Sequence, residues 1–184
     1  MKKIILLSLM ALALFVNCTG AQKKVATKPL SENLKGGVLL TSFYTAVKYN
    51  DIVVKDKAGN VIFSDDFSTK KADWQGGEEW EVVDGQAQML DSMNFDSRYA
   101  VYNTTMEAQT IILKGTRVEG DEGICLGFAA KDADHFYQFN VGGWASTKTD
   151  LQKIGDNGGI LAEAKNVKFN SVPVGKEVEL KVEL

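Results

Sequence analysis

Hydrophobic and polar residues alternate along most of the chain from Gly36 onward. A period of two is typical of strands that bury one face, and these segments are rich in β-branched and aromatic residues. Turn residues separate the segments, and the Asp84-Gly85 pair between two such runs predicts a tight hairpin. No segment has the periodicity of a long amphipathic helix. Many short strands at regular spacing predict an all-β fold, a two-sheet antiparallel sandwich over residues 36–184.

The last run of the chain, residues 177–184, has the pattern of a half-buried strand. Its charged positions fall on one face, and the other face carries Val178, Leu180, Val182 and Leu184. A strand edge with an apolar face is a liability that proteins normally cover. Either strands from elsewhere in the chain pair with it, or the sandwich is C-terminally truncated and lacks its last strands. We favour truncation.

The N-terminus has the pattern of an export signal. Lys2 and Lys3 precede an almost wholly apolar run over residues 4–16, which is too short to span a bilayer. Signal peptidase could cut after Ala21, which gives a signal peptide of residues 1–21. Alternatively, a lipoprotein signal ends at residue 17 and Cys18 carries the lipid. Residues 22–35 are polar and without periodicity, which predicts a flexible tether.

Both alternatives predict an exported protein that is periplasmic, on the cell surface or extracellular. With the second, the protein is an outer-membrane lipoprotein candidate, and its contact with a membrane is the lipid anchor. The chain carries 21 Lys and Arg against 24 Asp and Glu, a net charge of −3. Because its basic residues form no cluster, nucleic acid is not expected as a partner.

The chain has few residues that could carry chemistry. It holds 1 His and 2 Cys, too few for a zinc site or a nucleophile with its base. Cys125 lies in an alternating run and is predicted to be a small buried hydrophobe. Phosphate-binding and dinucleotide-binding glycine motifs are absent. We therefore expect no catalytic residue and no cofactor.

Acidic residues offer two weaker possibilities. Glycoside hydrolysis needs two carboxylates facing one cleft; Glu119 and Asp121 have a suitable offset, but the next position on that face is Gly123, so this segment is interpreted as a turn. Asp65 and Asp66 are weak calcium candidates, because oxygen-rich loops can bind this ion. A solvated turn is the alternative interpretation of that pair.

The segment from Asp132 to Lys148, "DADHFYQFNVGGWASTK", has the strongest features of a binding face. One face of the strand has His135 at its solvent-exposed end, followed by three predicted core residues, Tyr137, Phe139 and Val141. The opposite parity carries a different set, Phe136, Gln138 and Asn140. Two glycines then let the strand kink before Trp144. Since sugars stack on aromatic rings and hydrogen-bond to amides, the predicted ligand-binding residues are Phe136, Gln138, Asn140 and Trp144.

Three more residues have both a ligand-binding and a structural interpretation. Arg98, in "DSRYA", offers a fixed fork of donors suited to vicinal hydroxyls or a carboxylate, and we add it to the predicted ligand-binding set. A salt bridge to Asp96 or another acid explains Arg98 equally well. Trp74 and Trp80 flank a Gly-Gly pair, and we favour a packing role for both.

Two long stretches, "GGVLLTSFYTAVKYNDIVVKDKAGNVIFSDDFS" and "EGICLGFAAKDADHFYQFNVGGWASTK", resemble laminin-G and concanavalin-like modules. Similar modules are embedded in exported family 51 α-L-arabinofuranosidases of Bacteroidetes-type bacteria. The resemblance runs from Gly36 to Leu184 and implies a jelly roll whose concave sheet is often used for glycans. It does not imply catalysis, because the catalytic carboxylates of those enzymes belong to a separate barrel domain.

The chain departs from these modules at two places. Gln138 stands where they usually carry a bulky aromatic residue, and a final hairpin after the last strand is missing, which agrees with truncation. We predict a non-catalytic, exported carbohydrate-binding module for a polysaccharide or oligosaccharide, with arabinose-containing glycans as the first candidates. The alternatives are a fragment of, or accessory to, an α-L-arabinofuranosidase, and a structural surface domain without a ligand.

Overall fold

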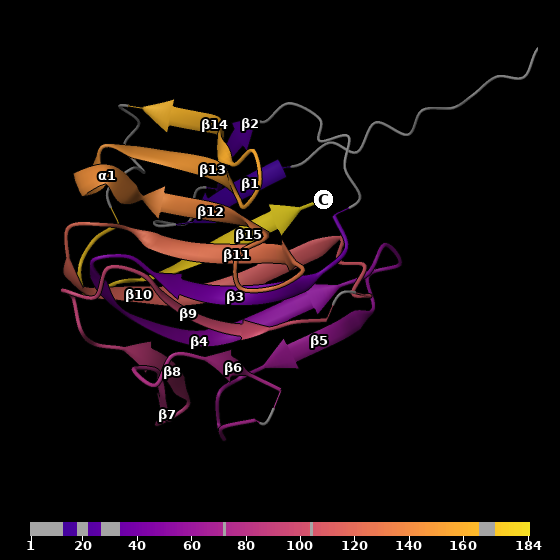
Figure 1. The fold of residues 1–184 in the computed structure, drawn as a ribbon, viewed down its shortest axis with the longest axis horizontal. Helices are drawn as coiled ribbons and strands as arrows, with labels where there is room; N and C mark the ends of the chain where they lie inside the picture. The colour runs from indigo at the N-terminus through magenta and orange to yellow at the C-terminus, as the bar shows by residue number, and fades with distance from the viewer. Residues whose placement is uncertain (1–12, 18–21, 27–33, 72, 104, 166–171) are drawn as a thin grey trace, which may run out of the picture.

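The protein is a sandwich of two antiparallel β-sheets in a computed structural model (Figure 1). The structure describes residues 13–17, 22–26, 34–71, 73–103, 105–165 and 172–184. The sandwich predicted from the alternating pattern is confirmed. Within the described residues, no helix is long and apolar enough to cross a bilayer.

The first sheet has the strand order β2–β1–β15–β10–β4–β8–β7, and β5 also pairs with β4. Its strands are β1 (Ala13–Asn17), β2 (Gln22–Ala26), β4 (Thr45–Lys55), β5 (Val61–Asp65), β7 (Glu81–Val83), β8 (Gln86–Met89), β10 (Thr110–Gly120) and β15 (Glu177–Glu183). The second sheet has the order β14–β13–β12–β11–β3–β9–β6. Its strands are β3 (Gly37–Ser42), β6 (Gln75–Gly76), β9 (Ser97–Val101), β11 (Ile124–Ala130), β12 (Phe136–Gly142), β13 (Lys148–Ile154) and β14 (Gly159–Lys165).

The main core fills the space between the sheets. Strand parity decides which side chains enter it: Tyr137, Phe139 and Val141 of β12 are buried there, as predicted. Phe136 belongs to a separate, smaller apolar cluster with Leu39 of β3. The two faces of β12 therefore serve different surroundings, and only one of them holds the sandwich together.

Trp74 and Trp80 are core residues, which confirms the packing interpretation. Their rings stack on either side of Tyr99, with centroids 4.9 Å and 5.8 Å from it. Tyr49 continues the stack 6.0 Å from Trp80. Such an aromatic stack buries a large apolar area between the sheets. Neither tryptophan is available to a ligand on the surface.

The predicted hairpin at Asp84-Gly85 is confirmed. It joins β7 to β8, and both residues have positive φ, 52° and 72°. This is the conformation that the two central positions of a tight hairpin turn require.

The outer edge of β15 is paired in this structure. Strand β1 lies antiparallel to it, from Ala13 opposite Glu183 to Asn17 opposite Glu179, and β2 pairs with β1 in turn. Strands from elsewhere in the chain thus cover the apolar-faced edge, and C-terminal truncation stays a prediction. The sequence of the expected tether gives no sign of β2, because polarity alone does not separate an edge strand from a linker. Cys18 and the bond after Ala21 lie outside the described residues.

Candidate functional site

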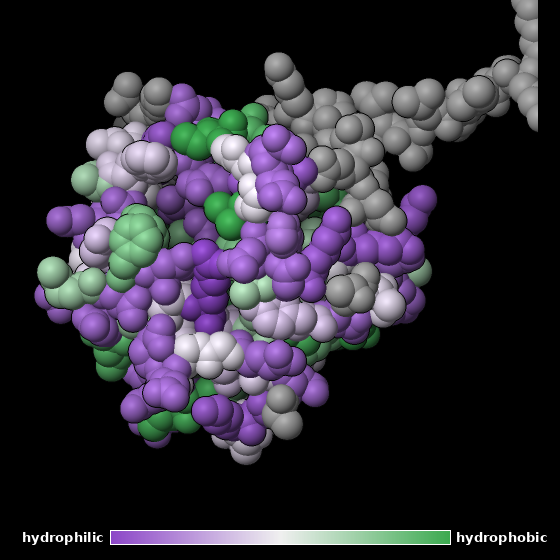
Figure 2. Space-filling model, viewed as in Figure 1, coloured by the Kyte–Doolittle hydropathy of each residue, from purple (hydrophilic) through white to green (hydrophobic). Residues whose placement is uncertain are grey.

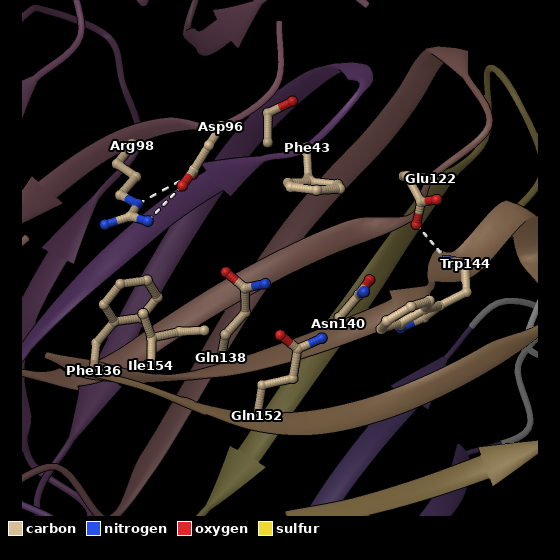
Figure 3. A pocket seen from close by; sticks show the side chains of 11 residues that line it. Phe43, Asp96, Arg98, Glu122, Phe136, Gln138, Asn140, Trp144, Gln152 and Ile154 are labelled. Carbon is tan, nitrogen blue, oxygen red and sulfur yellow. Dashed lines mark hydrogen bonds and ion pairs between the residues drawn. The ribbon is translucent and has the colours of Figure 1, made fainter. Parts of the chain in front are cut away.

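A pocket of about 280 Å³ opens on the outer face of the second sheet, away from the core (Figure 3). Figure 2 shows this face of the molecule as mostly hydrophilic, with scattered apolar side chains. The pocket is lined by Ser42, Phe43, Asp96, Arg98, Glu122, Phe136, Gln138, Asn140, Trp144, Gln152 and Ile154. All five residues predicted to bind a ligand are in this set, so the structure brings them together around one pocket.

The register of the strands explains why a pocket forms at this place on the sheet. One row across the sheet pairs, in order, Arg98, Thr41, Cys125, Asn140 and Asp150. The next row pairs Ala100, Leu39, Gly127, Gln138 and Gln152. Directly paired positions of antiparallel strands share a face. Because the middle strand β11 contributes only a cysteine and a glycine, the larger side chains of its neighbours stand around a depression.

Two buried side chains next to the pocket, Thr41 and Cys125, hold its amides in place. The Thr41 hydroxyl donates to the Gln138 side-chain oxygen at 3.0 Å, and the Cys125 thiol contacts the Asn140 side-chain oxygen at 3.4 Å. Burial raises the pKa of the Cys125 thiol, so at neutral pH it is protonated and acts as a weak donor. The prediction of Cys125 as a small buried side chain is confirmed by its 3% exposure. Both amides are held through their oxygens.

A left-handed turn carries Trp144 to the rim. The turn, α1 (Gly143–Ser146), follows Gly142 at φ 74°, and Trp144, Ala145 and Ser146 have φ of 57°, 54° and 60°. The sequence predicts a kink here but no helical turn. Each such residue with a side chain costs about 1–2 kcal/mol, and strain of this kind concentrates at functional sites.

Glu122, which precedes β11, binds this turn through its side chain. Its carboxylate accepts hydrogen bonds from the backbone N–H groups of Trp144 and Ala145, the second at 3.1 Å (Figure 3). Successive N–H groups in a left-handed turn form a concave anion site, which here binds the protein's own carboxylate. Glu122 is thus bound to the turn and lines the pocket as well.

The indole of Trp144 is oriented by two further contacts. Its Nε1 donates to Asp150 Oδ2 at 2.7 Å, and the Lys148 ammonium lies 3.8 Å from the ring centroid. The residue is still 49% exposed, a large aromatic surface for a side chain fixed so firmly. A ring that is both oriented and exposed is suited to stacking against a ligand.

Asp150 is the buried carboxylate behind this ring. Its second oxygen accepts from Gln152 Nε2 at 2.8 Å. Burial raises the pKa of the Asp150 carboxyl, and the bonds from Gln152 and Trp144 act in the opposite direction. Asp150, Gln152 and Trp144 therefore form one hydrogen-bonded unit at this end of the pocket.

Arg98 and Phe136 form the opposite end. The Arg98 guanidinium pairs with both carboxylate oxygens of Asp96, with Nε 3.1 Å from Oδ1, and lies 5.1 Å from the Phe136 ring centroid. It also donates to the backbone oxygen of Ala133. The salt bridge between Arg98 and Asp96 is therefore present, and both residues also line the pocket.

The lining and supporting residues that are not predicted as ligand-binding from the sequence include Phe43, Glu122, Asp150 and Gln152. For Asp150 and Gln152 a signal exists, because both have the parity that places them opposite Asn140 and Gln138 once β12 and β13 pair across the Gly-Gly kink. Phe43 and Glu122 come from distant turns. Nothing in their local sequence marks them.

The calcium candidates have structural partners. Asp65 is buried and accepts from the Phe67 N–H at 2.8 Å and from Trp74 Nε1 at 2.7 Å. Its carboxylate also pairs with Lys71 Nζ at 2.9 Å. Asp66 accepts from the Ser68 N–H at 3.0 Å. The described residues contain no group of three or more His, Cys, Asp or Glu arranged to hold a metal. Calcium binding stays a prediction.

The chain is similar to a known extracellular protein. The chain is 28% identical over 178 residues to an extracellular exo-alpha-L-arabinofuranosidase of Streptomyces chartreusis. The match covers 93% of this chain and 21% of that protein. No family model and no solved structure matches the chain. The chain therefore spans about a fifth of the length of this curated relative, and it is similar to a module within a larger extracellular enzyme.

Proposed function

We propose that the protein is a non-catalytic carbohydrate-binding module that acts outside the cytoplasm. The observation that carries the proposal is the oriented, half-exposed Trp144 ring beside the amides of Gln138 and Asn140 in one pocket. An aromatic face stacks on the CH face of a sugar, and amides and carboxylates hydrogen-bond to its hydroxyls. The volume of about 280 Å³ is close to the lower end of ligand pockets, roughly 300–1,000 Å³, and suits one or two sugar rings.

The charges favour a neutral sugar. The positive charge of Arg98 is balanced by Asp96, and Glu122 adds a further carboxylate to the lining. A uronic acid would face this carboxylate without a free cation, at an electrostatic cost. Arabinose-containing polysaccharides fit this lining, and the similarity to a module of an arabinofuranosidase supports the same choice.

The carboxylates of the pocket also support a non-catalytic role. Glycoside hydrolysis needs one carboxyl group as acid and another as base or nucleophile, both facing the scissile bond. Here Glu122 binds the turn, Asp96 binds Arg98, and both oxygens of Asp150 accept hydrogen bonds behind the Trp144 ring. Each of these groups serves to shape the pocket.

Affinity electrophoresis tests the proposal. Gels that contain arabinan or arabinoxylan are expected to retard the protein, and gels with a uronate-rich pectin are expected to retard it less. Trp144→Ala should abolish the retardation, because it removes the stacking surface. Val61→Ala is the control, since it also truncates an exposed apolar residue but lies in the first sheet. A chain that no polysaccharide retards would favour a structural surface domain, and a Trp144→Ala variant that is retarded as strongly as the unaltered chain would place binding outside this pocket.

A second candidate function is that of an accessory module to an α-L-arabinofuranosidase, favoured by the match to one fifth of such an enzyme. Joined to an arabinofuranosidase catalytic domain, the chain should raise hydrolysis of insoluble arabinan. It should leave hydrolysis of a small chromogenic arabinofuranoside unchanged, because that substrate needs no targeting. By itself the chain should hydrolyse neither substrate.

A further inference from the structure

Three aromatic rings from two turns gather on the surface beside the pocket. Phe43 and Tyr44 lie between β3 and β4, and Phe95 lies in the turn that precedes β9. Phe43 is 4.8 Å from Phe95 and 5.2 Å from Tyr44 between ring centroids, and Tyr44 is 5.4 Å from Phe95. We call these three residues the aromatic triad. They are 37%, 41% and 61% exposed in chain order, so the rings pack on one another and still face solvent.

Hydrogen bonds and a close backbone contact hold the two turns of the triad together. The Tyr44 N–H donates to the Asn94 backbone oxygen at 2.9 Å, and the Asp96 N–H donates to the Asn94 side-chain oxygen at 3.1 Å. Tyr44 has φ 45°, a conformation that is rare for a bulky residue. Gly120 packs closely against this turn, because a Cβ at residue 120 would lie 2.4 Å from the Tyr44 backbone oxygen. The fold thus maintains a strained turn that presents rings to solvent, which points to a binding role.

The triad is continuous with the pocket. Phe43 belongs to both, and Asp96, which follows Phe95 directly, also lines the pocket. A ligand that extends beyond the pocket at this end meets the triad next. The rings are interleaved with polar groups: Asn94 and Ser97 both donate to the Glu79 carboxylate, at 3.4 Å and 2.7 Å. A surface that carries rings and hydrogen-bonding groups side by side is suited to a polyhydroxylated ligand. It is less suited to a flat apolar surface of another protein.

We propose that the aromatic triad is a second stacking subsite, which binds the next residues of the same oligosaccharide whose first residue fills the pocket. This inference rests on the proposed function and adds to it: the protein recognises a stretch of glycan chain, not a single sugar. Exposed edge-to-face rings offer separate faces to successive sugars, and each stacking contact contributes to affinity.

Isothermal titration with L-arabinose and α-1,5-linked arabino-oligosaccharides, from the disaccharide to the pentasaccharide, tests the subsite. The unaltered chain should bind longer oligosaccharides more tightly than the monosaccharide. Phe95→Ala should weaken binding of the longer ligands by about fivefold to tenfold and leave the monosaccharide unchanged. Met93→Ala is the matched control, because it truncates a 78% exposed side chain of the same turn outside the triad. It should leave every affinity unchanged.

The outcomes separate the subsite from the pocket. If Phe95→Ala binds all lengths as well as the unaltered chain while Trp144→Ala binds none, the subsite is wrong and the proposed function stands. If affinity is independent of chain length, the subsite is also wrong. If no sugar binds, both proposals fail. If Phe95→Ala changes only self-association in sedimentation, the triad is a protein contact and the subsite is overturned.

Discussion

At the scale of single residues, Asp150 links the stability of the protein to the shape of its pocket. The residue is fully buried, and it fixes both Trp144 and Gln152. A carboxylate loses hydration when it is buried, so its protonated form is favoured in the folded chain. The two hydrogen bonds it accepts are what make the charged form tolerable there. Asp150 fixes the Trp144 ring, and the free-energy cost of burying its charged carboxylate depends on pH.

This gives a prediction for the pH dependence of folding. The pKa of Asp150 is raised above its ordinary value of 3.8, so between that value and the raised one the folded state binds more protons than the unfolded state. The contribution of Asp150 to the free energy of unfolding is then complete below about pH 4 and is lost as pH rises through the raised pKa. Asp150→Asn should remove this decline. Urea unfolding at a series of pH values measures it.

The control for that experiment is Asp56→Asn. Hydrogen bonds from Asn60 lower the pKa of this exposed turn carboxyl. Its stabilising effect is therefore present above its ordinary pKa and lost as pH falls, the opposite sign to Asp150. An Asp150→Asn variant with the same pH profile as the unaltered chain would show that Asp150 does not titrate differently in the two states.

At the scale of elements, the left-handed turn α1 depends on a residue that is distant in sequence. Glu122 precedes β11, whereas the turn follows β12, and the carboxylate bridges them. Because the turn conformation is unfavourable for Trp144, Ala145 and Ser146, we expect this bridge to stabilise it.

We expect Glu122→Ala to weaken glycan binding by about tenfold, through loss of the Trp144 position and without unfolding of the sandwich. Trp74 and Trp80 are buried, so quenching of tryptophan fluorescence by acrylamide reports mainly on Trp144. Quenching should increase in Glu122→Ala and be partly restored in Glu122→Gln, which retains an acceptor oxygen.

Glu119→Ala provides the matched control, because Glu119 is an exposed acid near the end of β10. It should alter neither quenching nor binding. Normal affinity in Glu122→Ala would mean that the turn holds its shape without the carboxylate.

The strands of this protein are more predictable than its turns, for a physical reason. Parity along β12 separates core residues such as Phe139 from pocket residues such as Gln138, because alternation is a local property of a strand. The Asp84-Gly85 hairpin is also encoded locally. The turn at Trp144 is not, since its conformation opposes local preference and its N–H groups bond to Glu122, which is distant in sequence. Phe43 enters the pocket for a similar reason, through pairing of β3 with β9 and β11.

At the scale of the whole molecule, the first sheet is completed by residues that sequence analysis assigns to an export signal. Strand β1 covers the outer edge of β15 and lies within the predicted signal peptide of residues 1–21. The alternation of β15 shows which face is buried, but it does not identify the neighbouring strand. Pairing of distant segments is the part of a β fold that local pattern specifies least.

Removal of residues 1–21 should therefore expose the edge of β15. In an antiparallel sheet about half of a strand's N–H groups bond to each neighbour, so alternate amides of Glu177–Glu183 lose their partners. Hydrogen exchange should become at least about tenfold faster at those amides. Amides of β11, in the other sheet, serve as the internal reference and should not change. Equal protection of β15 in both forms would contradict the role of β1 at this edge.

The small residues along β11 have a consequence for how this surface can change. Cys125 and Gly127 make the hollow by lacking bulk, while the polar contacts come from β12 and β13. Depth and hydrogen-bonding capacity are therefore set by different strands. Side-chain volume at Cys125 changes the depth of the pocket together with the contact to the Asn140 amide oxygen, and leaves the polar side chains of β13 as they are. At Gly127 an added Cβ would lie 2.8 Å from the Leu39 Cβ, so a larger residue there would also displace β3.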